Sequence, residues 1–531
     1  MGKEFDTDIE LDVILDEVGD FGRYQVYVYT YLSVAIMVTA IYNCQYVFSA
    51  GIVKYRCQVP ECESPPLNYT PGPWANFALP ASGSNCKRLV PLRKKCEPAS
   101  FSNKTQHCTS WVYESNDTIV PEFELACQEW KRTMVGTVHS AGVFFSIPLT
   151  AFVSDVFGRR HALIGTCVGP ALFGMLRGFC YNYYVYLVLE FVEALVGAGT
   201  YSTAFILALE IVGLKKRVIG GNILACVFAV GQMLTAVAAW AMPYWRTFTI
   251  VIFSPSFAFI IYYSFVEESL RWLLVHGKRK EAIRVIYKMA RQNRVKLMPK
   301  TMEMLSDAPK KKSVIPFPRT ELMNRKPVLN EETKKKSLLT QVLKSRIIMF
   351  RICVCSFWWI TTTLIYYGLS INSVSLAGNK YLNYIMTSIV EIPAGLINML
   401  TLDRFGRKAS ILTGFFICAI SLLIIPFIND AASTVGLTLV AKMLITMNFV
   451  AIYIYTVELF PTEVRHRLVG TCSMMGRIGS MTAPQTPLLV VAVYEVAPLL
   501  GVRGDGECGG TADAAHAGDA AHEAARHHRR G

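Results

Sequence analysis

Charged residues are scarce in this chain, and motifs that would define an enzyme are missing. Only 17% of its 531 residues are Asp, Glu, Lys or Arg, whereas 52% are apolar. No glycine-rich phosphate-binding loop and no His or Cys cluster with metal-ligand spacing is present, which argues against an ATP-driven pump, an enzyme, and a bound metal or other cofactor. Composition favours a membrane protein but does not decide the class.

Two N-terminal signals are also absent. The acidic stretch Met1–Glu17 precedes the first apolar run, so we expect no cleavable signal peptide. Position six is Asp6 rather than Ser or Thr, so N-myristoylation is not indicated either. We therefore expect residues 1–23 to form a cytoplasmic N-terminus.

Apolar runs long enough to cross a bilayer, about 20 residues each, recur along the chain. Six lie near 24–46, 133–153, 162–180, 183–212, 219–240 and 248–266, and five lie near 347–370, 383–402, 409–428, 434–458 and 468–491. This distribution predicts an all-α polytopic membrane protein. Its expected segments are span one (24–53), a long loop (54–132), spans two to six (133–266), a basic loop (267–346), spans seven to eleven (347–491) and a tail (492–531).

The loops between the expected spans differ in character. Basic residues gather in the short loops of one side, which the positive-inside rule assigns to the cytoplasm. The opposite, extracellular side receives loop 54–132, which carries glycosylation sequons at Asn68, Asn103 and Asn116. The same loop holds six cysteines, which suggests up to three disulfides in one of fifteen pairings. These are Cys57, Cys62, Cys86, Cys96, Cys108 and Cys127.

The loop from Arg271 to Arg346 contains 21 Lys and Arg against six Asp and Glu. Its first part, Lys280 to Arg291, has helical periodicity and is predicted to lie as an amphipathic helix under the membrane. The net charge of +14 could indicate a nucleic-acid partner. A tethered loop that faces anionic lipid explains the charge more simply, so we expect no nucleic-acid partner.

One pattern of charges occurs twice. Asp-x-x-Gly-Arg-Arg starts at Asp155, and Asp-x-x-Gly-Arg-Lys starts at Asp403, an offset of 248 residues. A glutamate follows 55 residues after each aspartate, and an arginine seven residues after that. We interpret this as an internal duplication that forms a cytoplasmic gate. The predicted gate comprises Asp155, Gly158, Arg159, Arg160, Glu210, Arg217, Glu268 and Arg271, with Asp403, Gly406, Arg407, Lys408, Glu458 and Arg465.

These motifs resemble the major facilitator superfamily, and more narrowly its organic cation, anion and carnitine transporters (solute carrier family 22). Matching phrases occur at Gly19–Gln25, Cys127–Trp130, Tyr366–Ser370, Gly378–Asn383, Glu391–Ala394 and Tyr455–Thr462. The resemblance covers roughly residues 10 to 495 and implies two pseudo-symmetric six-helix halves. Residues after Leu500 lack the expected twelfth span, so we predict about 11 spans and interpret the tail as a shifted reading frame or a splice variant. Glu190 stands where the resemblance leads us to expect arginine.

An alternating-access carrier needs a polar site near the bilayer midplane. Ionisable residues there cost roughly 2.5–3.5 kcal/mol on insertion scales, so the few present are candidates for function. The candidates are Trp359, Tyr366, Tyr367, Glu391 and Arg477. Helix packing of the aromatic residues, or a structural Glu391–Arg477 pair, remain open. His139 stands alone in its apolar run and is expected to pack.

The resemblance connects charge with substrate. Carnitine-type members combine an acid in span eight with an arginine in span eleven, as Glu391 and Arg477 do here, whereas Val450 stands at the third position. This predicts a secondary-active plasma-membrane transporter of organic cations or zwitterions, namely carnitine-like or other amphoteric amines, that works by alternating access. Sodium and a proton are the candidate coupling ions. The alternatives are an organic cation transporter proper, an organic anion exchanger, and a non-transporting membrane scaffold.

Overall fold

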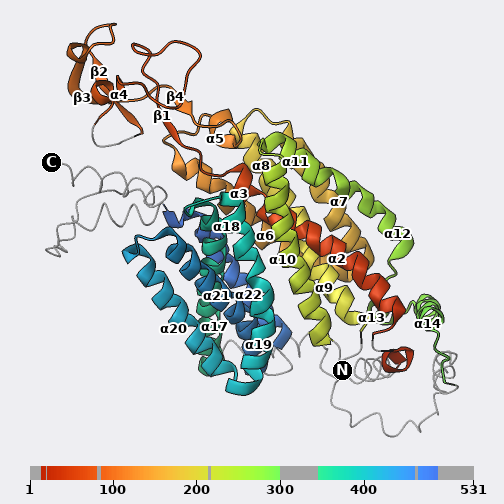
Figure 1. The fold of residues 1–531 in the computed structure, drawn as a ribbon. Coiled ribbons are helices and arrows are strands. Elements are labelled where there is room, and N and C mark those ends of the chain that lie inside the picture. Colours follow the sequence, from red (N-terminus) through yellow and green to blue (C-terminus); the bar gives the residue numbers. More distant parts are fainter. Residues whose placement is uncertain are drawn as a thin grey trace, which may run out of the picture.

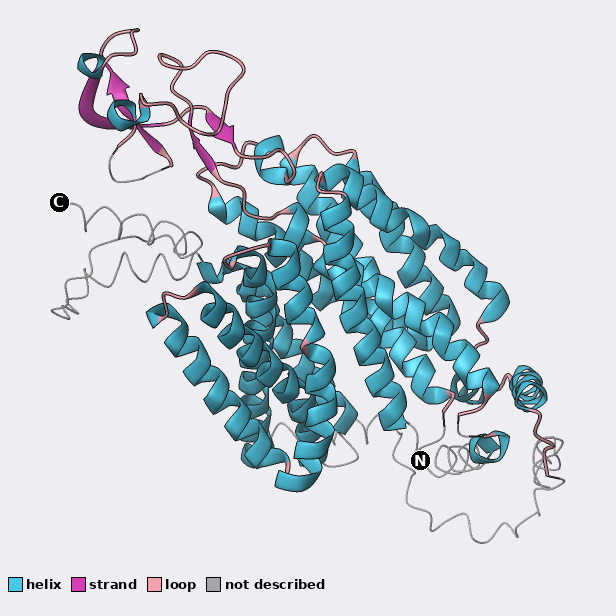
Figure 2. Ribbon diagram, in the orientation of Figure 1, coloured by secondary structure: helices cyan, strands magenta, loops and turns pink. Residues whose placement is uncertain are grey.

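Two groups of long helices lie side by side, and a small disulfide-bonded domain projects from one end of them (Figure 1). The computed structural model describes residues 14–19, 21–80, 85–212, 217–298, 345–460 and 465–487. Helices dominate among these residues, and the strands that the structure describes all lie in the projecting domain (Figure 2). We call the end with this domain the loop-domain end and the opposite end the α14 end.

The first helix group contains five of the segments that are long and apolar enough to cross a membrane. Its helices are α2 (Arg23–Cys44), α3 (Tyr46–Ser49), α6 (Glu129–Phe157), α7 (Arg159–Gly178), α8 (Tyr183–Gly197), α9 (Gly199–Glu210), α10 (Arg217–Ala241), α11 (Trp245–Phe253), η3 (Ser254–Ile261), α12 (Tyr262–Phe265) and α13 (Leu270–Val275). Helices α6 and α8 approach each other so closely that Gly142 of α6 cannot carry a side chain. A Cβ at this position would lie 2.6 Å from the carbonyl oxygen of Phe191 in α8.

The second helix group contains the other four such segments among the described residues. Its helices are α17 (Arg346–Asn372), η5 (Ser373–Ser375), α18 (Lys380–Ile389), α19 (Glu391–Phe405), α20 (Arg407–Ile424), η6 (Ile425–Phe427), α21 (Ala431–Leu459), α22 (Arg465–Thr482) and η7 (Ala483–Gln485). Side-chain caps begin three of them: Ser345 accepts from the backbone of Ile348, Asn379 from that of Tyr381, and Asp430 from that of Ser433.

Each of the eleven predicted spans overlaps helical residues, but the last one, 468–491, extends beyond the described residues. Helices α7 and α22 are not among the nine segments that qualify by length and hydropathy in the described chain. Both helices carry basic residues, including Arg177 in α7 and Arg477 in α22. Both pack inside the bundle, α22 against α17 and α7 against α8. Because neighbouring helices cover them, they need less apolar surface than a lipid-facing span.

The projecting domain is built from two small antiparallel pairs. Strand β1 (Tyr55–Cys57) pairs with β4 (Trp111–Tyr113), and β2 (Lys87–Pro91) pairs with β3 (Phe101–His107), with α4 (Ala75–Ala78), η1 (Pro98–Ser100) and α5 (Ile119–Glu122) between and after them. All six predicted cysteines are paired, as Cys57–Cys108, Cys62–Cys96 and Cys86–Cys127. Asn68, Asn103 and Asn116 are exposed, so their side chains are accessible.

Helix α14 (Arg279–Asn293) is amphipathic, as predicted, and packs its apolar face against the rest of the protein. Its apolar residues, among them Val285 and Met289, pack into the first group's core with Leu15 and Val18. Asn293 fixes its end by accepting from the backbone N–H of Tyr24 at 2.8 Å. The amphipathic face was predicted correctly, but protein rather than lipid covers it. The basic segment beyond, 299–344, and the tail 488–531 lie outside the described residues.

The two groups meet along two seams. At one, α6 packs against α22 and η7, where Ser140 donates to the Ser480 carbonyl at 3.1 Å and Thr137 to that of Met481 at 3.0 Å. At the other, α10 packs against α18 and α19. Any motion of one group against the other must therefore break or slide these contacts.

Candidate functional site

Glu391 lies at the centre of a buried polar network in the second group. The span that contains it is divided at Val390, between α18 and α19, so Glu391 opens α19. Its carboxylate forms an ion pair with Lys442 of α21, 3.0 Å between Oε1 and Nζ. The Lys442 side chain is 1% exposed and that of Glu391 is 9% exposed. Because water and salt ions hardly reach this ion pair, the attraction between its two charges is weakened very little by screening.

Tyr366 of α17 and Gln232 of α10 complete the surroundings of the carboxylate. The Glu391 carboxylate accepts a hydrogen bond from the Tyr366 hydroxyl at 2.7 Å and another from the Gln232 side-chain amide at 3.3 Å. Lys442 donates to Ser370 at 2.6 Å, and its ammonium lies 3.2 Å from the centre of the Tyr366 ring. Because Gln232 belongs to the first group, this network joins the two helix groups.

Arg477 is connected to the network through two tyrosines. Its guanidinium donates to the hydroxyl of Tyr367 at 3.3 Å, and the Tyr367 ring lies edge-on to Tyr366 at 5.2 Å. Arg477 itself is half-buried. The direct Glu391–Arg477 pair that the sequence left open is not the arrangement found, because each residue has a different partner.

Trp359 lies one step further from the charges. It is buried, donates to Thr456 at 3.2 Å, and packs on Phe449, which also touches Tyr366. The structure thus connects all five predicted site residues through direct or shared contacts. It also adds Lys442 and Gln232, which the sequence analysis missed. Lys442 is a lone lysine inside an apolar run, and that signal could have identified it.

A second buried charged cluster, also unforeseen, lies in the first group. Arg177 of α7 binds Glu190 of α8 and lies 3.5 Å from Glu193. His139 of α6 contacts the same carboxylates, with Nδ1 2.9 Å from Glu190 and 3.9 Å from Glu193. His139 is therefore not an isolated packing residue. Glu190, which occupies a position where arginine was expected, receives its arginine from the neighbouring helix.

Three of these side chains also have the spacing of a metal site, since ligand atoms of His139, Glu190 and Glu193 lie within 4.8 Å of one another. The guanidinium of Arg177, however, donates to both carboxylates. A cation already occupies the place where a metal ion would bind. We therefore interpret the cluster as an ion-pair network and not as a metal centre.

The first predicted gate motif forms a connected set of charges at the α14 end. Arg159 pairs with Asp155 at 2.8 Å and with Glu210 at 3.7 Å, and Arg160 donates to the Tyr263 carbonyl. Arg271, in α13, is close enough to act on the charge of Glu210. The side chain of Arg217 lies outside the described residues.

Glu268 holds the start of α7. Its carboxylate accepts from the backbone N–H groups of Arg159, at 2.8 Å, and Arg160, at 3.2 Å. These amides have no partner within the helix, and the helix dipole favours a negative charge there. Gly158 precedes them with a φ of +102°, and a Cβ at this position would collide with the Glu268 carboxylate.

The second gate motif repeats part of this geometry. Arg407 pairs with Glu458 at 3.1 Å, and Gly406 has a φ of +80°, as at the first motif. Lys408 lies in the first turn of α20. The side chains of Asp403 and Arg465 lie outside the described residues. Each ion pair named at either motif joins residues of the same helix group.

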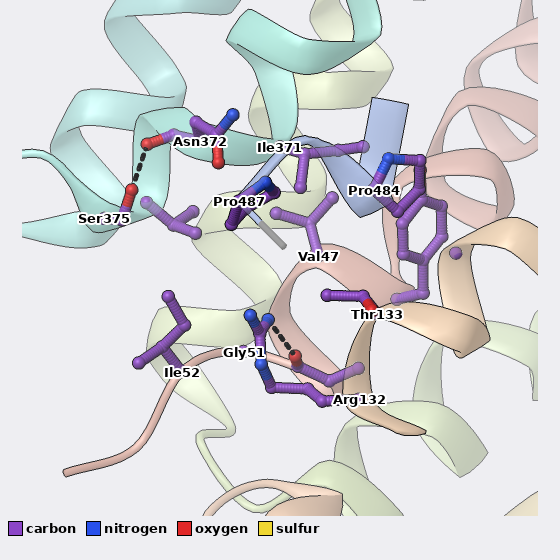
Figure 3. Close-up of a pocket in the computed structure, with 14 residues that line it drawn as sticks. Val47, Gly51, Ile52, Arg132, Thr133, Ile371, Asn372, Ser375, Pro484 and Pro487 are labelled. Carbon is purple, nitrogen blue, oxygen red and sulfur yellow. Dashed lines mark hydrogen bonds between the residues drawn. The ribbon is translucent and has the colours of Figure 1, made fainter. Parts of the chain in front are cut away.

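A small cavity of about 40 Å³ lies at the loop-domain end, between α3, α6 and the end of α17 (Figure 3). Arg132 reaches into this region and donates to the Ala50 carbonyl at 3.4 Å. Pro484 and Pro487 close it from the second group. A space of this size holds a water molecule or two and no organic substrate.

The arrangement of the helices is similar to that of solved transporter structures. It is similar to the partially occluded, inward-open xylose transporter XylE from E. coli, with a TM-score of 0.55, 12% identity, and coverage of 87% of this chain and 93% of that one. The family model "Sugar (and other) transporter" matches residues 91–495.

Sequence comparison narrows the class. An organic cation transporter-like protein of Drosophila melanogaster is 30% identical over 508 residues, covering 92% of this chain and 86% of that protein. Solute carrier family 22 member 1 of Bos taurus is 28% identical over 520 residues, covering 93% and 87%. The chain belongs to the sugar (and other) transporter family of the major facilitator superfamily and is a transporter of the organic cation transporter type, not an enzyme. The predicted resemblance is confirmed.

Proposed function

We propose that this protein is a secondary-active transporter of carnitine-like zwitterions and related organic cations in the plasma membrane. Eleven spans in two pseudo-symmetric halves would rock about the Glu391 network, with the N-terminus and the gate motifs in the cytoplasm and the disulfide-bonded domain outside. The observation that carries the proposal is this network. It places one carboxylate, two cations and two tyrosines in contact at the junction of the helix groups.

The charges suit a substrate with both signs. Glu391 would receive the ammonium group, and the Tyr366 ring already holds the ammonium of Lys442 in such a position. Exchange of one cation for another at Glu391 avoids leaving a buried carboxylate unpaired, a loss worth several kcal/mol. Arg477, which is half-buried and bonded to a neutral phenol, is the group available for a substrate carboxylate.

A second candidate follows from the charge sum. Lys442 and Arg477 are two cations against one carboxylate, so the network has a formal charge of +1. An organic anion would neutralise it, whereas a simple cation would raise it to +2 unless Lys442 moves away. This favours the organic anion exchanger as second candidate over a cation transporter proper. A non-transporting scaffold has no comparable support.

The gate is proposed to act through each helix group separately. Asp155, Arg159 and Glu210 tie the α6–α7 loop to α9, and Arg407 and Glu458 tie the start of α20 to α21. Ion pairs within a group make its α14 end rigid, so that the group moves as one body. The α6–α22 hydrogen bonds near the loop-domain end would then break when the carrier opens outward.

Uptake of three radiolabelled compounds into transfected cells tests the proposal: carnitine, tetraethylammonium and a dicarboxylate. We expect carnitine uptake to exceed that of the other two. The matched variants are Glu391→Gln, which should abolish carnitine uptake, and Lys104→Met on the exposed β3 strand, which should not. Dicarboxylate uptake alone would establish the second candidate. No uptake of any compound, with normal surface expression, would contradict transport.

A further inference from the structure

The buried cluster of the first group has an odd number of charges. Arg177, Glu190 and Glu193 are at most 1% exposed, and His139 is 4% exposed. One guanidinium faces two carboxylates, so the cluster carries −1 while His139 is neutral. A net charge held away from water costs several kcal/mol, which binding of one proton would remove.

The geometry identifies where this proton would bind. Glu190 accepts from Arg177, from His139 at 2.9 Å and from Gln45 at 3.1 Å, so it is well satisfied as a carboxylate. Among the described residues, the polar partners of Glu193 are Arg177, at 3.5 Å, and His139, at 3.9 Å. It is the more weakly held of the two carboxylates. The His139 Nε2 is buried and has no hydrogen-bond partner in the described structure. Glu193 and His139 are therefore the proton acceptors of the cluster.

Besides Gln45, the elements around the cluster contribute aromatic side chains. Tyr46 of α3 lies 5.1 Å from the His139 ring, and Tyr186 of α8 and Phe253 of α11 lie 5.5 and 5.3 Å from the Arg177 guanidinium. Tyr42 of α2 also faces the cluster near Glu193. Helix α22 of the second group packs against α6, and its cation Arg477 is bonded to Tyr367 and not to the cluster in the described structure.

The cluster is mechanically connected to the seam between the helix groups. His139 is adjacent to Ser140 on α6, whose hydroxyl donates to the Ser480 carbonyl of α22 at 3.1 Å. The ring of Tyr46, which touches His139, and Pro484 both lie against Gly136 of the same helix. A change of charge at His139 therefore acts on the helix that must separate from α22 for the carrier to change state.

We propose that the His139–Glu193 pair binds one proton in each transport cycle and couples substrate movement to a pH difference across the membrane. The proton comes from water on the side to which the site is open, binds the Glu193 carboxylate or the free imidazole nitrogen, and leaves as hydronium on the other side. This inference rests on the proposed transport function, and it adds the coupling ion and the groups that carry it.

Purified protein in liposomes tests the coupling with carnitine as substrate. A pH difference of one unit should change the equilibrium ratio of carnitine inside to carnitine outside about tenfold if one proton moves per substrate. An acidic outside drives accumulation if the proton moves with the substrate, and an acidic inside drives it if the two are exchanged, so the difference is applied in both directions. Glu193→Gln and His139→Gln should abolish this response but keep substrate counterflow, which needs no gradient. His107→Gln, on the exposed end of β3, is the matched control. A retained pH response in both variants, or a response only to sodium, would overturn the proposal.

A measurement without substrate separates this inference from the transport proposal. Infrared difference spectra of the purified protein between acid and neutral pH should show the C=O stretch of a buried protonated carboxyl group, which Glu193→Gln removes. If wild-type protein shows no counterflow, the transport proposal fails, whereas the infrared band still supports the proton site. The absence of that band together with a lack of pH response refutes the proton site even in an active carrier.

Discussion

Removal of the Lys442 ammonium is the most direct test of the central network. In Lys442→Met the side chain keeps its length and apolar stem, but Glu391 loses its ion pair at 3.0 Å. Removing one partner of a buried ion pair costs about 3–5 kcal/mol, because the other charge stays buried without compensation. The variant should therefore be markedly less stable than wild type.

Heating of the purified protein in detergent, followed by size-exclusion chromatography, measures this effect. We expect a lower midpoint for Lys442→Met and recovery of most of the loss in the double variant Lys442→Met/Glu391→Gln, in which no charge is left unpaired. A saturating quaternary amine should stabilise the single variant more than it stabilises wild type, because Glu391 is then free to receive it. Lys104→Met, on the exposed surface of β3, controls for the loss of a lysine.

Two results would refute this reasoning. If the double variant is no more stable than the single one, Lys442 acts through packing and not through the charge of Glu391. If the amine stabilises both proteins equally, Glu391 does not contact the substrate. The first result concerns the fold of the network and the second its role in binding, so the two can be told apart.

Three further predictions follow from the described contacts. Arg477→Asp should lower carnitine uptake at least tenfold and raise that of tetraethylammonium, and a loss of both in uptake assays would show that Arg477 is structural. Glu268→Gln should lower stability by about 1–2 kcal/mol, because the start of α7 near Arg159 loses an anionic cap; thermal midpoints that match wild type would contradict this. Cys62→Ser with Cys96→Ser should cost about 4 kcal/mol, since that disulfide closes a separation of 34 residues. Its readout is surface expression, which should fall.

The apolar runs, the duplicated charge motif and the family phrases are patterns along the chain, so what they indicate could be predicted from the sequence. The apolar runs located the nine described segments that are long and apolar enough to cross a membrane, since such a segment needs only length and hydropathy to be recognised. The 248-residue offset predicted that Arg159 and Arg407 lie near Glu210 and Glu458, and both pairs are found, at 3.7 and 3.1 Å. The motif phrases indicated the family, which the comparisons confirm.

The pairing of charges was decided only by the tertiary structure. Glu391 and Lys442 are 51 residues apart on different helices, and nothing local indicates that the divided span at Val390 directs the carboxylate toward α21. For the same reason the sequence predicted His139 to be an isolated packing residue, whereas the packing of α6, α7 and α8 places it beside Arg177 and Glu190. Hydropathy shows which residues are buried, but the rotation and packing of each helix determine which buried charge meets which. A buried charge depends on that partner for its stability and its chemistry.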